Sequence, residues 1–333
     1  MPTPLDPSLL TMTEIIRLQT ALSQELTRRF ERNAALAFTD VVDSTAYFAQ
    51  FGDEAGRRLQ QLHLDLLESC LRSSDGHIVD TAGDGAFAAF ATAGAAVGSM
   101  VALQNRVSLE NVDRPRAHQL CLRIGLHWGP VLTDGVQVTG DAVNLCARLA
   151  ALALPGQVHL TRELYQQLDS QQRSLCRLLG SVALKGISRS VEAFLLQWRD
   201  PVRFPSEVLI RETGQRLMLP ARDALTFGRG DTQDGTTAPD VALVLPDPLA
   251  CKLISRRQFE LCSRAQGYAL KALSAQLTEV DGVAVPREQQ VLIRPGTCVR
   301  VAGVMTLDFV AAPVTGQVAV DQTLDGPGAK ANR

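Results

Sequence analysis

Between residues 34 and 198, short apolar runs alternate with long helical periodicities, and their order constrains the fold more than any other feature of the chain. A strand ending at Asp40 precedes a helical pattern over 45–72, in which leucines recur three or four residues apart. A hairpin over 77–90, a helix over 92–110 and a strand over 120–128 follow. This order predicts an α/β fold of the ferredoxin-like sandwich class over 34–198.

The hydrophobic pattern changes after that segment. Residues 199–205 are predicted to form a linker, and residues 206–312 contain short apolar runs separated by Gly, Pro and Asp. We expect no helix between 206 and 311, so this part is predicted to be an all-β sandwich. Residues 313–333 are polar, contain Gly and Pro, and are predicted to be disordered.

The N-terminal segment, residues 1–33, contains a helical pattern over 9–32 with Ile15, Leu18, Leu22 and Leu26 at helical spacing. Two interpretations of this pattern stay open. The helix either forms a dimer with a second copy or packs on its own domain.

Composition excludes several classes of protein. A net charge of −2 and 5% aromatic residues argue against nucleic-acid binding. No apolar run approaches the roughly 18 residues that span a bilayer. The N-terminus also lacks the features of a signal peptide, so we expect a cytoplasmic protein without a membrane span. The seven cysteines form no CxxC pair, which indicates neither a zinc site nor a disulfide framework.

Two carboxylates stand at strand ends. Asp40 closes the first strand, and Asp84 lies in a Gly-Asp-Gly bend between the next two. If these strands are neighbours, the carboxylates face one point, which suits Mg²⁺ with phosphate oxygens and water as further ligands. An Asp in such a bend is also an ordinary turn residue.

A helix predicted over 141–153 places Asn144 and Arg148 four residues apart, on one helix face. Side by side, they could hold a sugar and a phosphate. Spacing alone equally fits a solvated polar face.

Five segments, in order and in register, resemble the catalytic domain of class III adenylate and guanylate cyclases. The resemblance covers residues 34–198, and the segments are LAFTDVVDST, HIVDTAGDG, LRIGLHWGPV, TGDAVNLCARL and VALKG. It implies a homodimeric enzyme that makes a 3′,5′-cyclic nucleotide and pyrophosphate from a nucleoside triphosphate, using two Mg²⁺ or Mn²⁺ ions per site.

The resemblance also implies roles for individual residues. Asp40 and Asp84 match the metal ligands, Asn144 the residue that orients the ribose, and Arg148 the one that stabilises the transition state. The triphosphate contacts fall on Lys185, Thr45 and the backbone at Val41. In the family, one subunit supplies the metals and the other the asparagine and arginine, so a homodimer has two equivalent sites. Asp43 stands where many members have glycine.

The base-reading positions depart from the adenine-specific pattern. Asp80 stands where such members carry lysine, and Gln137 stands where they carry aspartate, threonine or serine. A carboxylate can accept hydrogen bonds from guanine N1 and its amino group, and a Gln amide can donate to a carbonyl. This pair favours GTP over ATP and leaves pyrimidine triphosphates open.

A second resemblance covers about residues 206–311. LTFGRG and ISRRQFEL resemble a forkhead-associated domain, a β-sandwich that binds phosphothreonine peptides. Arg229, Ser255 and Arg256 fall on its phosphate-binding positions. Gln258 replaces the usual histidine, and Leu277-Thr278 replaces the usual Asn-Gly. A retained scaffold for protein contacts explains this segment equally well.

Two functions are therefore compared. The first is a nucleotidyl cyclase coupled to a phosphothreonine-binding domain. The second is a catalytically weak dimer that senses nucleotide and recruits phosphorylated proteins.

Overall fold

The structure is a computed structural model that describes residue 8 and residues 10–187, 189–230, 238–287 and 289–311. The predicted tail over 313–333 lies outside the described residues. No helix in the described part of the chain is long and apolar enough to cross a bilayer.

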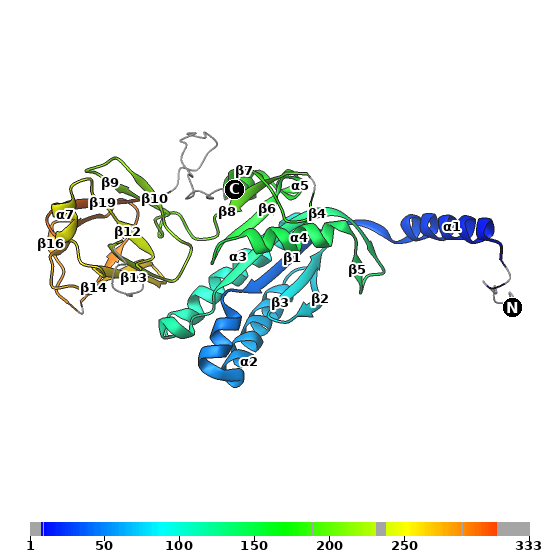
Figure 1. Cartoon of the computed structure of the whole chain (residues 1–333), viewed down its shortest axis with the longest axis horizontal. Coiled ribbons are helices and arrows are strands. Elements are labelled where there is room, and N and C mark those ends of the chain that lie inside the picture. The colour runs from blue at the N-terminus through cyan, green and yellow to red at the C-terminus, as the bar shows by residue number, and fades with distance from the viewer. Residues whose placement is uncertain (1–7, 9, 188, 231–237, 288, 312–333) are drawn as a thin grey trace, which may run out of the picture.

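An eight-stranded sheet forms the centre of the N-terminal part, in the order β2-β3-β1-β4-β6-β8-β7 with β5 beside β4 (Figure 1). Its strands are β1 Glu31–Val41, β2 Gly76–Ala82, β3 Gly85–Phe90, β4 Leu122–Thr133, β5 Val138–Thr139, β6 Val158–Thr161, β7 Cys176–Val182 and β8 Val191–Leu196. β1 runs antiparallel to both β3 and β4. The first four strands therefore have the predicted ferredoxin-like order, and β6, β8 and β7 extend the sheet beyond it.

Helices cover both faces of this sheet. Because side chains alternate along a strand, Ala35 and Ala37 of β1 join the large core beneath α2 and α3. Leu36 points the other way and packs with Ala142 and Cys146 of α4. The helices are α2 Ser44–Leu71, α3 Ala93–Asn111, the 3₁₀ turn η2 Arg116–His118, α4 Asp141–Leu152, α5 Arg162–Gln167 and α6 Ser170–Ser174.

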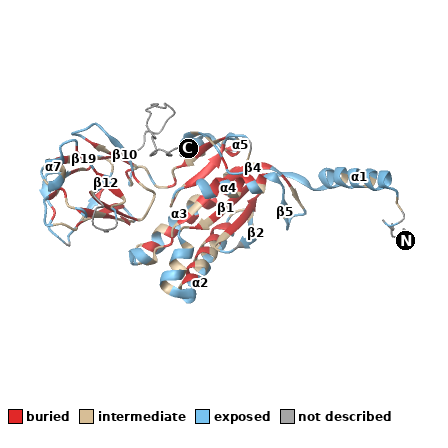
Figure 2. Cartoon of the chain, viewed as in Figure 1, coloured by how far each residue is buried: buried red, intermediate tan, exposed pale blue. Residues whose placement is uncertain are grey.

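The N-terminal helix α1, Met12–Phe30, begins with a capping box in which Thr11 and Glu14 bond reciprocally. None of its residues is buried, and Figure 2 shows it exposed along its length. It ends earlier than its periodicity predicts because the chain from Glu31 pairs with β4, opposite Leu132. Pairing with β4 sets this boundary, and the spacing of apolar residues in the sequence gives no sign of it.

Residues 207–310 form two further sheets that bury one common apolar core. The six-stranded sheet has the order β10-β9-β19-β18-β15-β16, and the five-stranded sheet the order β12-β11-β13-β14-β17. The strands are β9 Glu207–Ile210, β10 Arg216–Met218, β11 Ala224–Arg229, β12 Val241–Leu243, β13 Phe259–Arg264, β14 Gly267–Ala272, β15 Thr278–Val280, β16 Val283–Ala284, β17 Gln290–Ile293, β18 Cys298–Val301 and β19 Met305–Val310. We call these residues the C-terminal β region.

The prediction of no helix between 206 and 311 is wrong. A short helix, α7 Pro248–Leu253, interrupts the strands, with Pro in its first turn and Asp247 accepting from Leu249 N at 2.9 Å. Six residues are too few to show helical periodicity, so only this cap and the Pro signal the helix in the sequence.

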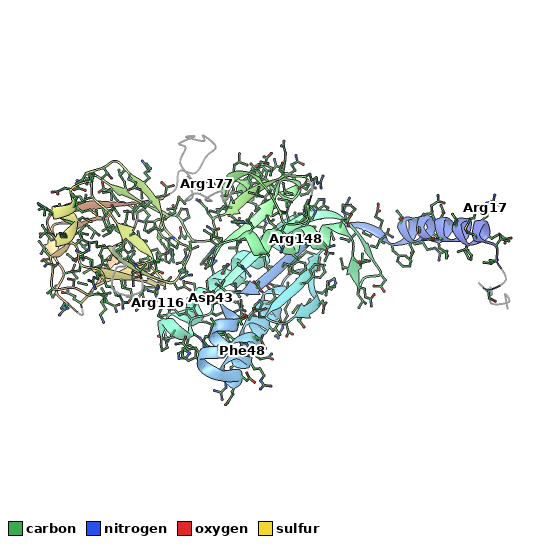
Figure 3. The ribbon with its side chains drawn as sticks, in the orientation of Figure 1. Arg17, Asp43, Phe48, Arg116, Arg148 and Arg177 are labelled. Carbon is green, nitrogen blue, oxygen red and sulfur yellow. The ribbon has the colours of Figure 1, made fainter. Side chains whose placement is uncertain are left out.

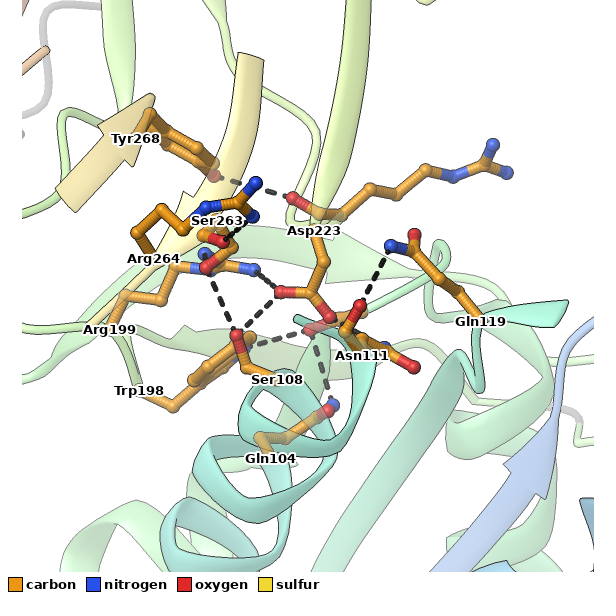
Figure 4. Close-up of polar contacts among 12 residues, drawn as sticks. Gln104, Ser108, Asn111, Gln119, Trp198, Arg199, Asp223, Ser263, Arg264 and Tyr268 are labelled. Carbon is orange, nitrogen blue, oxygen red and sulfur yellow. Dashed lines mark hydrogen bonds and ion pairs between the residues drawn. The ribbon is translucent and has the colours of Figure 1, made fainter. Parts of the chain in front are cut away.

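A buried polar junction joins the β region to the end of α3 (Figure 4). Asp223 accepts hydrogen bonds from Ser108 at 2.6 Å and from Asn111 at 2.7 Å, and it pairs with Arg199 at 2.6 Å. The side chains of Arg199 and Asp223 are only 12% and 10% exposed. Residue 199, predicted to begin a linker, is thus part of a packed contact.

Candidate active site

The two carboxylates lie on adjacent strands. β1 pairs with β3 so that Asp40 stands opposite Gly85, the residue after Asp84. Gly83, with φ of +63°, makes the left-handed turn that returns the chain into β3. The expectation that these strands are neighbours is confirmed. Both carboxylates stand at the same end of the sheet, where β1 finishes and β3 begins.

Arg123 of β4 pairs with Asp40 from the opposite side, where the two residues are register partners and form an ion pair. Burial raises the pKa of Asp40, Arg123 opposes this rise, and Asp84 adds to it through like-charge repulsion. The sequence analysis did not single out Arg123. Its signal was a cation within the otherwise apolar run LCLRIGLHW.

The start of α2 closes over Asp84. The Ser44 hydroxyl donates to the Asp84 carboxylate, and Val42 N donates to Cys121 O at 2.9 Å. Asp43 adopts φ of +56°, a left-handed conformation that glycine also accommodates. Thr45 is exposed, whereas the Val41 side chain is 3% exposed, so only the backbone of Val41 can contact a ligand.

A cavity of about 700 Å³ connects the metal and base positions of the prediction. Asp40, Asp80, Arg123 and Gln137 all line it, together with the ring of Phe87 and other apolar side chains. Asp80 projects from β2, and Gln137 stands in the turn before β5. The backbone N of Gln137 donates to Asp134 Oδ1 at 2.8 Å. The structure thus brings three predicted site residues to one concave surface, where polar groups converge beside apolar walls.

Asn144 and Arg148 form a separate cluster on the exposed face of α4. A Cβ on Gly186 would lie 3.4 Å from Arg148 Nη2, so the turn after Lys185 lies against Arg148. Figure 3 marks Arg148 on α4 and Asp43 at the start of α2. Within the described residues, no hydrogen bond or ion pair joins this cluster to Asp40 or Asp84.

The carboxylates of Asp40 and Asp84 suit a cation whose remaining ligands come from a bound molecule and water. No group of three or more His, Cys, Asp or Glu gathers as a metal site in the described part of the chain. Two carboxylates are the number that Mg²⁺ commonly takes from protein when phosphate oxygens and water complete its shell.

The β region brings Arg229, at the end of β11, beside the loop between α7 and β13 that contains Ser255 and Arg256. Arg229 N donates to Ser255 O at 2.9 Å, and a Cβ on Gly228 would lie 2.0 Å from Arg256 O, so only glycine permits this approach. Gln258 is fully buried, and its amide donates to Thr278 Oγ1 at 3.0 Å and to Gln276 O at 3.1 Å. Gln258 therefore joins two loops, the one that contains Ser255 and the one before β15.

Comparisons with known proteins find several relatives of this chain. A family model described as the adenylate and guanylate cyclase catalytic domain matches residues 27–198. Putative adenylate cyclase 3 of Rhizobium meliloti (strain 1021) is 26% identical over 222 residues, covering 66% of this chain and 38% of that protein. Guanylate cyclase soluble subunit beta-2 of Homo sapiens is 35% identical over 104 residues, covering 29% of this chain and 17% of that protein.

Among solved structures, an adenylate/guanylate cyclase/hydrolase from Silicibacter pomeroyi matches with a TM-score of 0.46 and 26% identity, over 50% of this chain and 96% of that one. The chain spans less than two thirds of the length of these two curated relatives.

Proposed function

The chain belongs to the adenylate and guanylate cyclase catalytic domain family, and from this premise we propose that it converts a nucleoside triphosphate into a 3′,5′-cyclic nucleotide and pyrophosphate at sites shared by two copies. The observation that carries the proposal is the separation of the two clusters. Asp40 and Asp84 lie at one sheet edge, while Asn144 and Arg148 stand exposed on α4 without a side-chain partner among the described residues. A twofold-symmetric pair of chains can bring the first cluster of one copy to the second cluster of the other, twice.

In the proposed reaction, the ribose 3′-oxygen attacks the α-phosphorus in line, and pyrophosphate leaves. Bound at Asp40 and Asp84, two Mg²⁺ or Mn²⁺ ions would activate the 3′-hydroxyl and neutralise the triphosphate. Asn144 orients the ribose, and Arg148 stabilises charge developing at the phosphorus, in the manner of preorganised donors. Val41 through its backbone, Thr45 and Lys185 hold the phosphates.

Arg123 extends this assignment. It lines the same cavity as Asp40 and pairs with its carboxylate. Binding of a cation at Asp40 would release the guanidinium, which can then bond a phosphate oxygen in a charge-assisted contact.

Asp80 and Gln137 are proposed to read the base. Both line the same cavity as Asp40. A carboxylate acceptor beside an amide donor matches guanine better than adenine, so we propose GTP as the preferred substrate.

A direct assay tests the cyclase. The purified chain is incubated with Mn²⁺ and each of ATP, GTP, CTP and UTP, and cyclic product is measured. Product that Asp40→Ala abolishes supports the proposal. No product from any of the four, with folded dimers shown to form, favours the alternative function of a catalytically weak nucleotide-sensing dimer.

Mixing two inactive variants tests whether the site is shared. In a heterodimer of Asp84→Ala and Arg148→Ala chains, one site combines an intact Asp84 with an intact Arg148. We expect activity to return on mixing. Absence of rescue, with mixed dimers demonstrated by differently tagged chains, would contradict the shared site.

We further propose that the β region forms a separate domain that binds a phosphothreonine peptide through Arg229, Ser255 and Arg256. Support comes from the close approach of Gly228 to Arg256 and from the clamp made by Gln258. A fluorescent library of phosphothreonine peptides is titrated into the full chain, with unphosphorylated peptides as control. We expect phosphate-dependent binding, which Arg229→Ala abolishes. Arg203→Ala, a change at an exposed turn residue, should retain it. Equal binding of both libraries, or of neither, indicates a scaffold.

A further inference from the structure

His63 lies where the apolar face of α2 would be expected to carry an aliphatic side chain. Leu59 and Leu67, one turn before and after it, are buried in the core beneath the sheet. His63 is itself only 1% exposed. A polar ring in this position is costly unless its nitrogens are hydrogen-bonded, so its partners indicate why it is there.

The ring contacts both chain segments that bear the metal-binding carboxylates. His63 Nε2 lies 2.8 Å from Thr39 Oγ1, in the residue directly before Asp40. The ring also lies close enough to Asp84 for its backbone and its carboxylate both to favour the protonated imidazole and so raise the pKa of His63. One imidazole thus bridges the end of β1 and the turn between β2 and β3.

The break in α2 makes this bridge possible. Gly52 is non-helical, with φ of +83°, and divides α2 into two parts that do not share one axis. The first part reaches Asp84 through Ser44, and the second reaches it again through His63. Both parts of the helix therefore hold the turn that carries Asp84.

The neutral state of the ring suits these contacts. Burial lowers the pKa of His63 to about 4, against a weaker opposing effect of Asp84. A neutral imidazole has one donor and one acceptor, and the Thr39 hydroxyl can take either role toward Nε2.

A buried histidine can serve the fold alone, and His127 in β4 provides that comparison. It is 5% exposed, its Nδ1 lies 2.9 Å from Thr161 Oγ1, and burial lowers its pKa to about 4. Neither His127 nor Thr161 adjoins Asp40 or Asp84 in the sequence or in strand register. His127 is therefore a matched control in burial, bonding and charge state.

We propose that His63 is a positioning residue that fixes the separation of Asp40 and Asp84, and hence the affinity of the pair for divalent cations. The inference rests on the proposed function, which assigns the cations to these two carboxylates. Partners that orient metal ligands from the next layer outward commonly change metal affinity roughly 10- to 100-fold when removed.

The experiment compares full-length His63→Leu, His63→Gln and His127→Leu with the unaltered chain. Leu keeps the apolar volume and removes both contacts, whereas Gln retains one amide donor and one acceptor. Mn²⁺ binding is followed by the loss of the free-ion electron paramagnetic resonance signal, in the presence of a non-hydrolysable triphosphate. The Mn²⁺ concentration for half-maximal activity, the KM for triphosphate and the melting temperature are measured beside it.

We expect His63→Leu to weaken Mn²⁺ binding about tenfold or more, His63→Gln to recover part of the loss, and His127→Leu to bind as the unaltered chain does. A His63→Leu affinity equal to that of the unaltered chain, or an equal loss in His127→Leu, overturns the inference. If His63→Leu does not fold, His63→Gln decides, and unchanged Mn²⁺ affinity in it counts against the inference. An unaltered chain that binds Mn²⁺ without making cyclic product contradicts the proposed catalysis, while the binding comparison still decides the role of His63.

Discussion

At the scale of single residues, the charge of Asp40 is subject to two opposing neighbours. Asp40 has two neighbours of opposite effect, because Arg123 favours its ionised form and Asp84 disfavours it. A cation that binds both carboxylates removes their repulsion and competes with Arg123 for Asp40. Asp80 and Gln137, which we propose to read the base, line the same cavity but are not among the groups that shift the pKa of Asp40, so specificity and catalysis should respond to different substitutions.

Substitution of the base-reading carboxylate should change substrate preference. We expect Asp80→Lys to lower kcat/KM for GTP and to raise the ratio of ATP to GTP turnover at least tenfold, because an ammonium cannot accept from guanine N1. Both kcat/KM values are measured with Mn²⁺. Asp65→Lys, a surface change on α2, is the control for added charge and should leave the ratio unchanged. An unaltered ratio in Asp80→Lys would exclude Asp80 from base recognition.

The buried histidines should make the fold sensitive to acid. Burial lowers the pKa of His63, His127 and His159 to about 4, from an ordinary 6.5. Because the unfolded chain binds more protons between these values, stability is full above pH 6.5 and falls as pH drops toward 4. Each histidine contributes a slope of about 1.4 kcal/mol per pH unit. Urea unfolding at pH 7.5 and pH 5 measures the loss, and His127→Leu should reduce the slope even where it lowers stability at pH 7.5. A pH-independent free energy of unfolding would contradict this account.

At the scale of elements, α1 is a helix whose apolar side chains are mostly exposed. Ile15, Ile16, Leu22 and Leu26 are each about half exposed, and none of the helix is buried. Of the two interpretations of this segment, we propose the dimerising helix, because none of its residues is buried. An amphipathic helix of 19 residues is marginal alone in water and gains most of its stability from burial of its apolar face.

We expect this helix to contribute to dimer formation. Charges introduced by the double change Leu22→Glu and Leu26→Glu should weaken self-association at least tenfold, because burying unpaired carboxylates at a helix contact is unfavourable. Sedimentation equilibrium measures the dissociation constant. The control Gln19→Glu with Gln24→Glu adds the same charge on the same helix. Equal dissociation constants for both double variants would show that the apolar face is not an interface.

At the scale of the whole molecule, the cyclase domain and the β region meet through charged groups, of which the Arg199–Asp223 pair is largely buried and Arg116 is exposed. Arg199 lies over the rings of Trp198, Phe204 and Tyr268 and pairs with Asp223, while Arg116 pairs with Asp240 and Glu260. Asn111 extends the junction inward, since its side chain bonds Asp223 and both backbone groups of Leu120. The backbone oxygen of the next residue, Cys121, accepts from Val42 N, two residues after the proposed metal ligand Asp40.

Removing Asp223 should weaken the junction strongly. Asp223→Ala leaves the Arg199 guanidinium buried without its partner, a change that costs about 3–5 kcal/mol in comparable pairs. Chemical denaturation of the full chain measures the free energy of unfolding. Glu54→Ala removes an ion pair whose side chains are about 80% exposed and should give no measurable change. A loss in Asp223→Ala no greater than that in Glu54→Ala would show that the junction contributes little.

The sequence by itself determined the strand and helix order, the α/β architecture and the Gly-Asp-Gly turn, because these depend on local periodicity and on backbone conformations that few residues adopt. The family assignment of residues 27–198 agrees with the motifs within them. Apolar runs near 175–185 and 190–198 predicted two further strands, and β7 and β8 lie there. Sequence patterns did not indicate α7 or the early start of β1, since a short element and a strand partner leave no local period.

Only the tertiary structure decided which side chains meet. Arg123 pairs with Asp40 from the neighbouring strand β4. His63, which follows the break at Gly52, lies beside Thr39 and Asp84. Asp223 bonds Asn111 from a distant part of the chain. Each contact joins residues far apart in sequence, and its formation follows from strand register and packing, which no run of neighbouring residues specifies.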